Sequence, residues 1–113
     1  MKRVILALLL ALPTSQSHAY EINDLVSAHY RCNALFDQKS LSDDETHICA
    51  DLNEQLKLHF VDGVDWEIFG ELSDEEKSSV SQQGYLRFKA WERSNLELVK
   101  QLETEAIQSI EIN

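Results

Sequence analysis

The chain has 113 residues, of which 43% are hydrophobic, and it carries 20 Asp plus Glu against 10 Lys plus Arg, a formal net charge of −10. A chain of this length forms one domain at most. Its negative charge argues against nucleic acid and anionic lipid as partners and favours basic proteins or cations, unless the charge serves only solubility.

Residues 1–19 have the layout of a cleaved secretory signal. A basic pair, Lys2 and Arg3, precedes the apolar run Val4–Leu12, and Ser17-His18-Ala19 places small residues three and one before Tyr20. The apolar run is much shorter than the ~20 residues needed to span a bilayer. We therefore predict a periplasmic or secreted protein, with residues 20–113 as a single mature domain and no stable membrane insertion after cleavage.

The composition of the mature domain favours helices. It has 94 residues, and losing Lys2 and Arg3 shifts the formal net charge from −10 to −12. It contains three glycines and no proline, and its apolar residues recur at spacings of three and four. These features predict an all-α fold: a small, disulfide-stapled bundle of three or four helices with a long C-terminal helix.

The first predicted helix begins near Asn23 or Asp24 and ends near Gln38, and the second begins after Ser42, where Glu45 completes a capping box. Asp62-Gly63 is a turn signal that ends the second helix. The first helix has an expected buried stripe of Leu25, Ala28, His29, Cys32, Leu35 and Phe36, and the second one of Ile48, Cys49, Leu52, Leu56, His59 and Phe60.

The two cysteines, Cys32 and Cys49, are expected to form a disulfide, because an exported chain meets an oxidising compartment. Each lies about two helical turns from a turn near Lys39, so the two face each other in an antiparallel hairpin. Closing a loop of ~15 residues contributes about 3 kcal/mol in the chain-entropy estimate.

The segment 60–69 combines aromatic, apolar and acidic residues in a connector. Its part Val64–Phe69 is too short to classify from its pattern and is expected to form a loop or a single helical turn. Aromatic side chains ringed by polar groups are typical of binding hot spots. The predicted partner-binding residues are Asp62, Asp65, Trp66, Glu67 and Phe69. Two alternatives are that these side chains fold back over the core and that the three acids form an ordinary acidic turn, since the register of a calcium loop is missing.

The last predicted helix runs from Asp74 to about Ile110, with a possible kink at Gly84. It follows a second capping box, Ser73 with Glu76. Its main seam, suited to packing against other helices, is Gly84, Phe88, Trp91, Asn95, Leu98 and Leu102, and a second apolar line is Leu96, Val99, Ala106, Ile107 and Ile110.

Signatures of catalysis are missing from the sequence: there is no Gly-x-Ser-x-Gly elbow and no Ser-x-x-Lys motif. We therefore expect no enzyme activity and no cofactor. His29, Cys32, His47 and Cys49 are the residues closest to a metal-ligand set, but a metal needs free thiolates, and we favour the disulfide.

These features predict an exported, non-enzymatic protein-binding domain. The function that suits them is that of an inhibitor or immunity-type protein that neutralises a basic envelope toxin or hydrolase. Alternative functions are those of a periplasmic stress or chaperone-like protein and of an accessory subunit of a secretion or surface assembly. The oligomeric state is left open.

Overall fold

The computed structural model describes residues 22–112, and the predicted signal, residues 1–19, lies outside the described residues. The described chain is helical throughout, with connecting loops and no strand, so the predicted all-α fold is confirmed. Residues 22–37 form the N-terminal helix, followed by α2 (Asp43–His59), α3 (Trp66–Glu71), α4 (Asp74–Ser94) and α5 (Leu96–Ile112).

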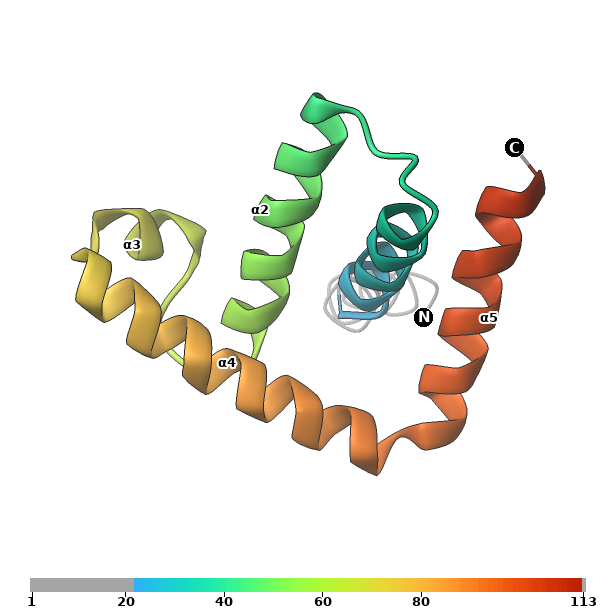
Figure 1. Ribbon diagram of the computed structural model, residues 1–113. Helices are drawn as coiled ribbons and strands as arrows, with labels where there is room; N and C mark the ends of the chain where they lie inside the picture. The colour runs from blue at the N-terminus through green and yellow to red at the C-terminus, as the bar shows by residue number, and fades with distance from the viewer. Residues whose placement is uncertain (1–21, 113) are drawn as a thin grey trace, which may run out of the picture.

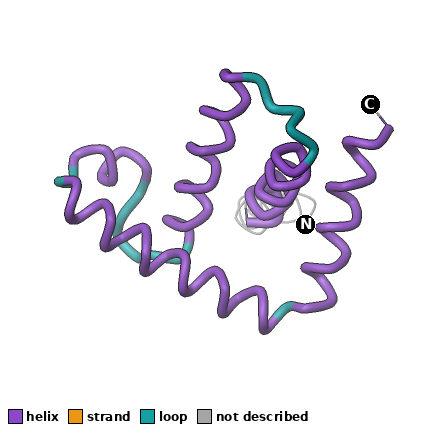
Figure 2. The backbone as a smooth tube through the Cα atoms, in the orientation of Figure 1, coloured by secondary structure: helices purple, strands orange, loops and turns teal. Residues whose placement is uncertain are grey.

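The helices are arranged around the N-terminal helix. In Figure 1, α4 crosses the base of the molecule, α2 and α5 rise from it, and the N-terminal helix lies between them. The short α3 lies beyond α2, near the start of α4. Figure 2 shows how little of the described chain is loop. None of the helices within residues 22–112 is long and apolar enough to cross a membrane.

Both predicted capping boxes are present. The Ser42 hydroxyl accepts a hydrogen bond from the Glu45 amide (3.2 Å), and the Glu45 carboxylate accepts one from the Ser42 amide (3.0 Å). Ser73 and Glu76 make the same pair at 3.1 and 2.9 Å. In each box the backbone hydrogen bond lowers the pKa of the glutamate. Local sequence therefore defines where α2 and α4 begin.

The long C-terminal helix predicted from Asp74 to Ile110 is interrupted at Asn95, and α4 is continuous through Gly84. Asn95 leaves helical geometry (φ −133°, ψ 42°), and its side-chain amide donates to the Trp91 carbonyl at 2.8 Å. An asparagine side chain that hydrogen-bonds to a nearby backbone group competes with the backbone hydrogen bonds of the helix. The break turns α5 back toward the core, and with the short α3 it brings the described part of the chain to five helices.

The core lies where the N-terminal helix, α2, α4 and α5 meet. The predicted stripe of the N-terminal helix is wrong in part, because Phe36 is 70% exposed whereas Val26 and Tyr30 are buried. By helical register Val26 and Tyr30 lie on another side of the helix from Cys32. A helix surrounded by three others buries more than one stripe. The core cluster comprises Val26, Tyr30, Leu56, Phe88, Leu102 and Ala106.

Gly84 lies at a close approach between α2 and α4. A Cβ atom at this position would lie 2.8 Å from the Cβ of Lys57 and closer still to the Lys57 backbone carbonyl. The absence of a Cβ at Gly84 therefore allows α2 and α4 to cross closely, and it does not kink α4. α2 and α4 form the most extensive of the contacts between α2, α3, α4 and α5.

Two further links hold the N-terminal helix. The Cys32–Cys49 disulfide joins it to α2 with a Cα–Cα distance of 5.8 Å, as predicted. On another side, the Tyr30 hydroxyl donates to Glu92 of α4 at 2.6 Å, and Lys89 forms an ion pair with the same carboxylate at 2.7 Å. Burial of the phenol is the largest cause that raises the pKa of Tyr30 far above its ordinary value, and the hydrogen bond to Glu92 is the second.

Replacing Gly84 with alanine is expected to lower the free energy of unfolding by about 1–3 kcal/mol, because the added methyl group overpacks the α2–α4 crossing. Gly70→Ala is the matched control, since a Cβ there meets nothing within 4 Å. Urea denaturation followed by circular dichroism measures both variants. Equal stabilities of the two variants would contradict the close approach.

Removing the disulfide with the pair Cys32→Ala and Cys49→Ala is expected to cost about 3 kcal/mol, because the unfolded chain gains the freedom that the crosslink removes. Thermal melting of the mature protein measures the loss. Reductant should lower the melting temperature of the wild type and leave that of the double variant unchanged. A wild type that is insensitive to reductant would contradict the crosslink's contribution.

Tyr30 gives the fold a dependence on alkaline pH. Because its pKa in the folded protein is raised, its contribution is complete below the unfolded tyrosine pKa of about 10 and is lost progressively as the pH rises above that value. The unfolding free energy of Tyr30→Phe is therefore expected to fall less steeply above pH ~10 than that of the wild type. Tyr85→Phe, which removes a phenol from an exposed position, is the comparison variant. Identical slopes for Tyr30→Phe and the wild type would be evidence against the buried phenol.

Candidate functional site

An open groove runs between the N-terminal helix, the C-terminal half of α2 and the segment 61–68. Its volume is about 500 Å³. Its apolar lining comprises Leu25, Leu58, Val61, Val64, Trp66 and Ile68, and Gln55, His59 and Asp65 add polar groups. Much of the segment that the sequence singled out therefore forms one wall of a surface depression, and this groove is the candidate functional site.

The groove wall depends on a compact turn between α2 and α3. Gly63 adopts a positive φ of 79°, a conformation that costs a glycine little. The Asp65 carboxylate then caps α3 by accepting a hydrogen bond from the Ile68 amide at 2.8 Å. Arg87 of α4 donates to the Phe60 carbonyl at 2.9 Å and so ties the end of α2 to α4. These contacts hold the connector in a defined shape.

Trp66 and Phe69 form a stacked pair, with ring centroids 5.9 Å apart and planes 11° from parallel. Trp66 is 44% exposed and lines the groove, whereas Phe69 is buried at 8% exposure. The Lys77 ammonium lies 5.9 Å from the centroid of the Phe69 ring. Of the two aromatic residues predicted to bind a partner, Trp66 is therefore accessible and Phe69 supports it from beneath.

The three predicted acidic residues differ in their positions. Asp65 lines the groove and caps α3, while Asp62 and Glu67 are exposed residues that flank the lining. Among residues 22–112, the ion pairs join Lys57 to Glu54 and Lys89 to Glu92, and they leave all three acids without a basic partner. Ile68, which is 44% exposed in the groove, belongs to the same surface and was not among the predicted binding residues.

Three of the four groups considered as metal ligands are engaged otherwise. Both cysteine sulfur atoms are in the disulfide, which removes the thiolates that a metal would need. His29 hydrogen-bonds Asn53 at 2.8 Å and Asn33 at 3.3 Å, and His47 is exposed at the start of α2. Within the described range, no three or more His, Cys, Asp or Glu residues gather in a way that could hold a metal ion.

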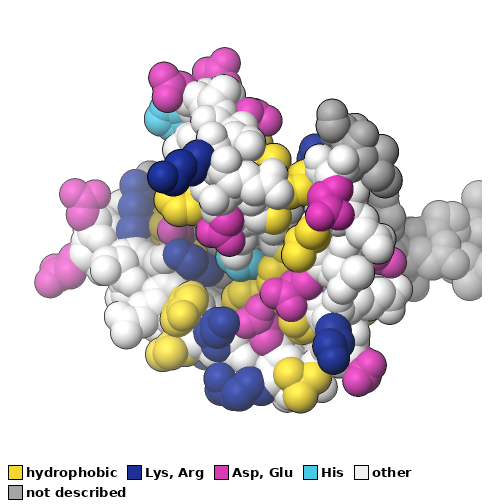
Figure 3. Space-filling view, turned by 45° about the vertical axis from the view of Figure 1, so that its right-hand side comes forward, with side chains coloured by type: hydrophobic (Ala, Val, Ile, Leu, Met, Phe, Trp, Pro, Cys, Tyr) yellow, Lys and Arg dark blue, Asp and Glu magenta, His cyan; other side chains and the backbone are white. Residues whose placement is uncertain are grey.

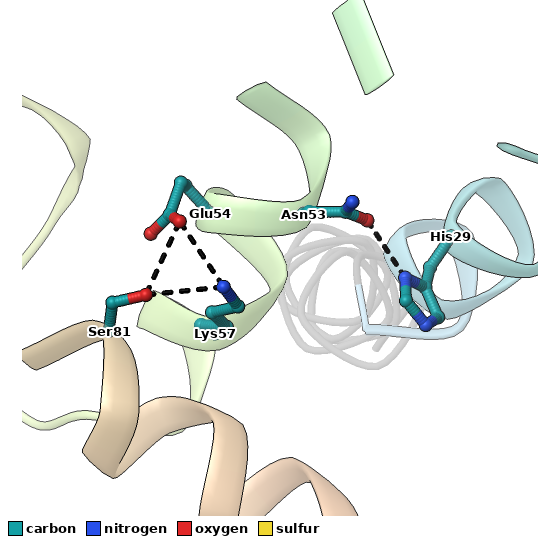
Figure 4. Close-up of polar contacts among 5 residues, drawn as sticks. All are labelled: His29, Asn53, Glu54, Lys57 and Ser81. Atoms are coloured by element: carbon teal, nitrogen blue, oxygen red, sulfur yellow. Dashed lines mark hydrogen bonds and ion pairs between the residues drawn. The ribbon is translucent and has the colours of Figure 1, made fainter. Parts of the chain in front are cut away.

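A second cavity, of about 240 Å³, lies between the N-terminal helix, α2 and α4 and was not anticipated from the sequence. Its polar lining comes from His29, Asn53, Lys57, Tyr85 and Lys89. His29 and Asn53 meet across the gap between two helices, and Lys57 is held by Glu54 and Ser81 (Figure 4). The sequence showed only the apolar seam through Phe88. That seam predicted that α4 packs against other helices, but it did not predict a cavity between them.

Comparison of the chain with protein-family models, with curated proteins and with solved structures found no match.

Proposed function

We propose that this chain is an exported, non-enzymatic domain that binds and neutralises a basic protein through the groove beside α3. The observation that carries the proposal is the combination at this groove of half-exposed Trp66 and Ile68 with the carboxylates of Asp62, Asp65 and Glu67, none of which has a basic partner. The predicted signal and the disulfide support a location in the periplasm or outside the cell.

The groove has the composition of a binding hot spot. Tryptophan is enriched among the residues that dominate binding energy, and a rigid stack such as Trp66 on Phe69 loses little side-chain freedom on binding. Acidic groups around the aromatic anchor attract a basic partner and raise its association rate. An inhibitor or immunity-type protein that meets a basic toxin or hydrolase of the envelope needs both properties.

The alternative function, that of a stress or chaperone-like protein, is supported by large apolar residues exposed elsewhere on the described chain. Phe36 is 70% exposed, Leu96 is 68% exposed, and Ile48 and Leu86 are each 57% exposed. A protein with many clients would use such surfaces together, with little dependence on any one residue. An accessory subunit would instead bury them in a stable complex.

The test is capture of envelope and secreted proteins by tagged residues 20–113, followed by affinity measurement with the captured partner. Trp66→Ala is expected to weaken binding by about thirtyfold or more, as for a hot-spot tryptophan. The pair Asp62→Lys and Glu67→Lys is expected to slow association and to reduce its salt dependence. Asp65 is left intact in this pair because its loss would uncap α3.

The matched control is the pair Asp51→Lys and Glu111→Lys, which changes the net charge equally at exposed positions on α2 and α5. It is expected to bind almost as well as the wild type. If the control pair weakens binding as much as the groove pair, the partner responds to net charge and not to this groove. Capture of many weakly bound proteins, with no effect of Trp66→Ala, would favour the chaperone-like alternative.

A further inference from the structure

We propose that the cavity between the N-terminal helix, α2 and α4 is a binding site for a small carboxylate with an apolar body. The inference rests on the lining of this cavity and is independent of the groove beside α3. It concerns a small-molecule ligand, whereas the proposed function concerns a protein partner.

The charge of the lining is opposite to that of the protein. The chain carries twice as many acidic as basic residues, yet the cavity is lined by Lys57 and Lys89 and by no Asp or Glu. Figure 3 shows a face of the molecule on which Lys and Arg side chains lie among acidic and hydrophobic ones, with a recessed histidine near its centre. Each ammonium group is also paired with a glutamate outside the lining, so the cavity favours an anion through its N–H donors and not through a net positive charge.

The polar groups of the lining retain hydrogen-bond donors. Lys57 donates to Glu54 and to Ser81, each at 3.2 Å, which leaves one of its three N–H groups. Lys89 uses one N–H on Glu92 and retains two. Glu54 and Glu92 do not line the cavity, so these contacts hold the two ammonium groups in place from outside it.

Asn53 and Tyr85 add neutral donors. Because the Asn53 side-chain oxygen can only accept, His29 donates to it through Nδ1, and the Asn53 NH2 group remains available. Asn33 lies 3.3 Å from the other ring nitrogen of His29, so both ring nitrogens are engaged. No hydrogen bond within the described residues engages the Tyr85 hydroxyl, and this side chain is 48% exposed. The available groups are donors, as a carboxylate requires.

The rest of the lining indicates the size of the ligand and the apolar character of the part that carries its carboxylate. The Tyr85 ring, which is 48% exposed, supplies most of the accessible apolar surface of the cavity, whereas Leu56 and Phe88 are exposed by only 1% and 4%. The His29 ring meets the Phe88 ring edge-on at 5.3 Å. Inorganic phosphate would leave this apolar surface uncovered. The volume of about 240 Å³ is below the roughly 300–1,000 Å³ of pockets for drug-sized ligands, so the ligand has one ring or a short chain.

Phenylacetate is a suitable probe, and phenylacetamide is its uncharged match in shape. Both are titrated into the mature protein, residues 20–113, and followed by amide and side-chain NMR shifts. Phenylacetate is expected to bind saturably, with shifts concentrated at Asn53, Leu56, Tyr85 and Phe88. The amide is expected to bind at least about tenfold more weakly, because it lacks the charge that the two lysines recognise.

Two variants locate the contacts. Lys89→Met, which removes an ammonium group, is expected to weaken phenylacetate binding about tenfold, and Tyr85→Phe is expected to weaken it less. Lys100→Met, at an exposed position of α5, controls for the loss of one positive charge. Thermal melts check the fold, since Lys89 also pairs with Glu92.

The comparison of the acid with the amide uses the wild type, so it decides the proposal even if Lys89→Met fails to fold. Equal binding of the two probes, non-saturating shifts, or shifts that map to the groove at Trp66 and Ile68 would each overturn it. Capture of a protein partner is unaffected by any of these results, so the failure of this proposal and the failure of the proposed function are distinguishable.

Discussion

The crossing of α2 over α4 at Gly84 is the contact on which the arrangement depends. Because this position carries no side chain, the backbone carbonyl of Lys57 comes close to α4. That approach brings Leu56 and Phe88 into one core and holds Lys57 within reach of Ser81. A larger residue at position 84 would separate the helices and disturb the surfaces on either side of α2.

By helical register, α2 presents opposite sides to the two depressions. Gln55, Leu58 and His59 face the acidic groove, whereas Asn53, Leu56 and Lys57 line the basic cavity. One helix therefore contributes to a groove beside unpaired carboxylates and to a cavity lined by two lysines. The N-terminal helix contributes to both as well, through Leu25 and His29, so its attachment matters for each. The disulfide and the Tyr30–Glu92 hydrogen bond supply that attachment from different sides.

Local chemistry made several features predictable. Ser42 with Glu45 and Ser73 with Glu76 defined two helix starts, because capping is a matter of residues three apart. The disulfide was predictable from export and hairpin spacing together. The exposure of Phe36 and the burial of Tyr30 were not predictable, because a single apolar stripe does not tell how many neighbours a helix has. The break at Asn95 was missed because its spacing fits the continuous seam of a longer helix.

The sequence by itself determined the helical class, the starts of α2 and α4, the cysteine pairing and the aromatic–acidic composition of the segment 60–69, because these depend on near neighbours along the chain. Only the tertiary structure decided that Trp66 is accessible while Phe69 is buried, that Gly84 serves a crossing, and which helices enclose the core. The basic cavity is the clearest case. Its lining residues come from three helices and lie as far apart in the chain as His29 and Lys89, so only the packing of those helices brings them together.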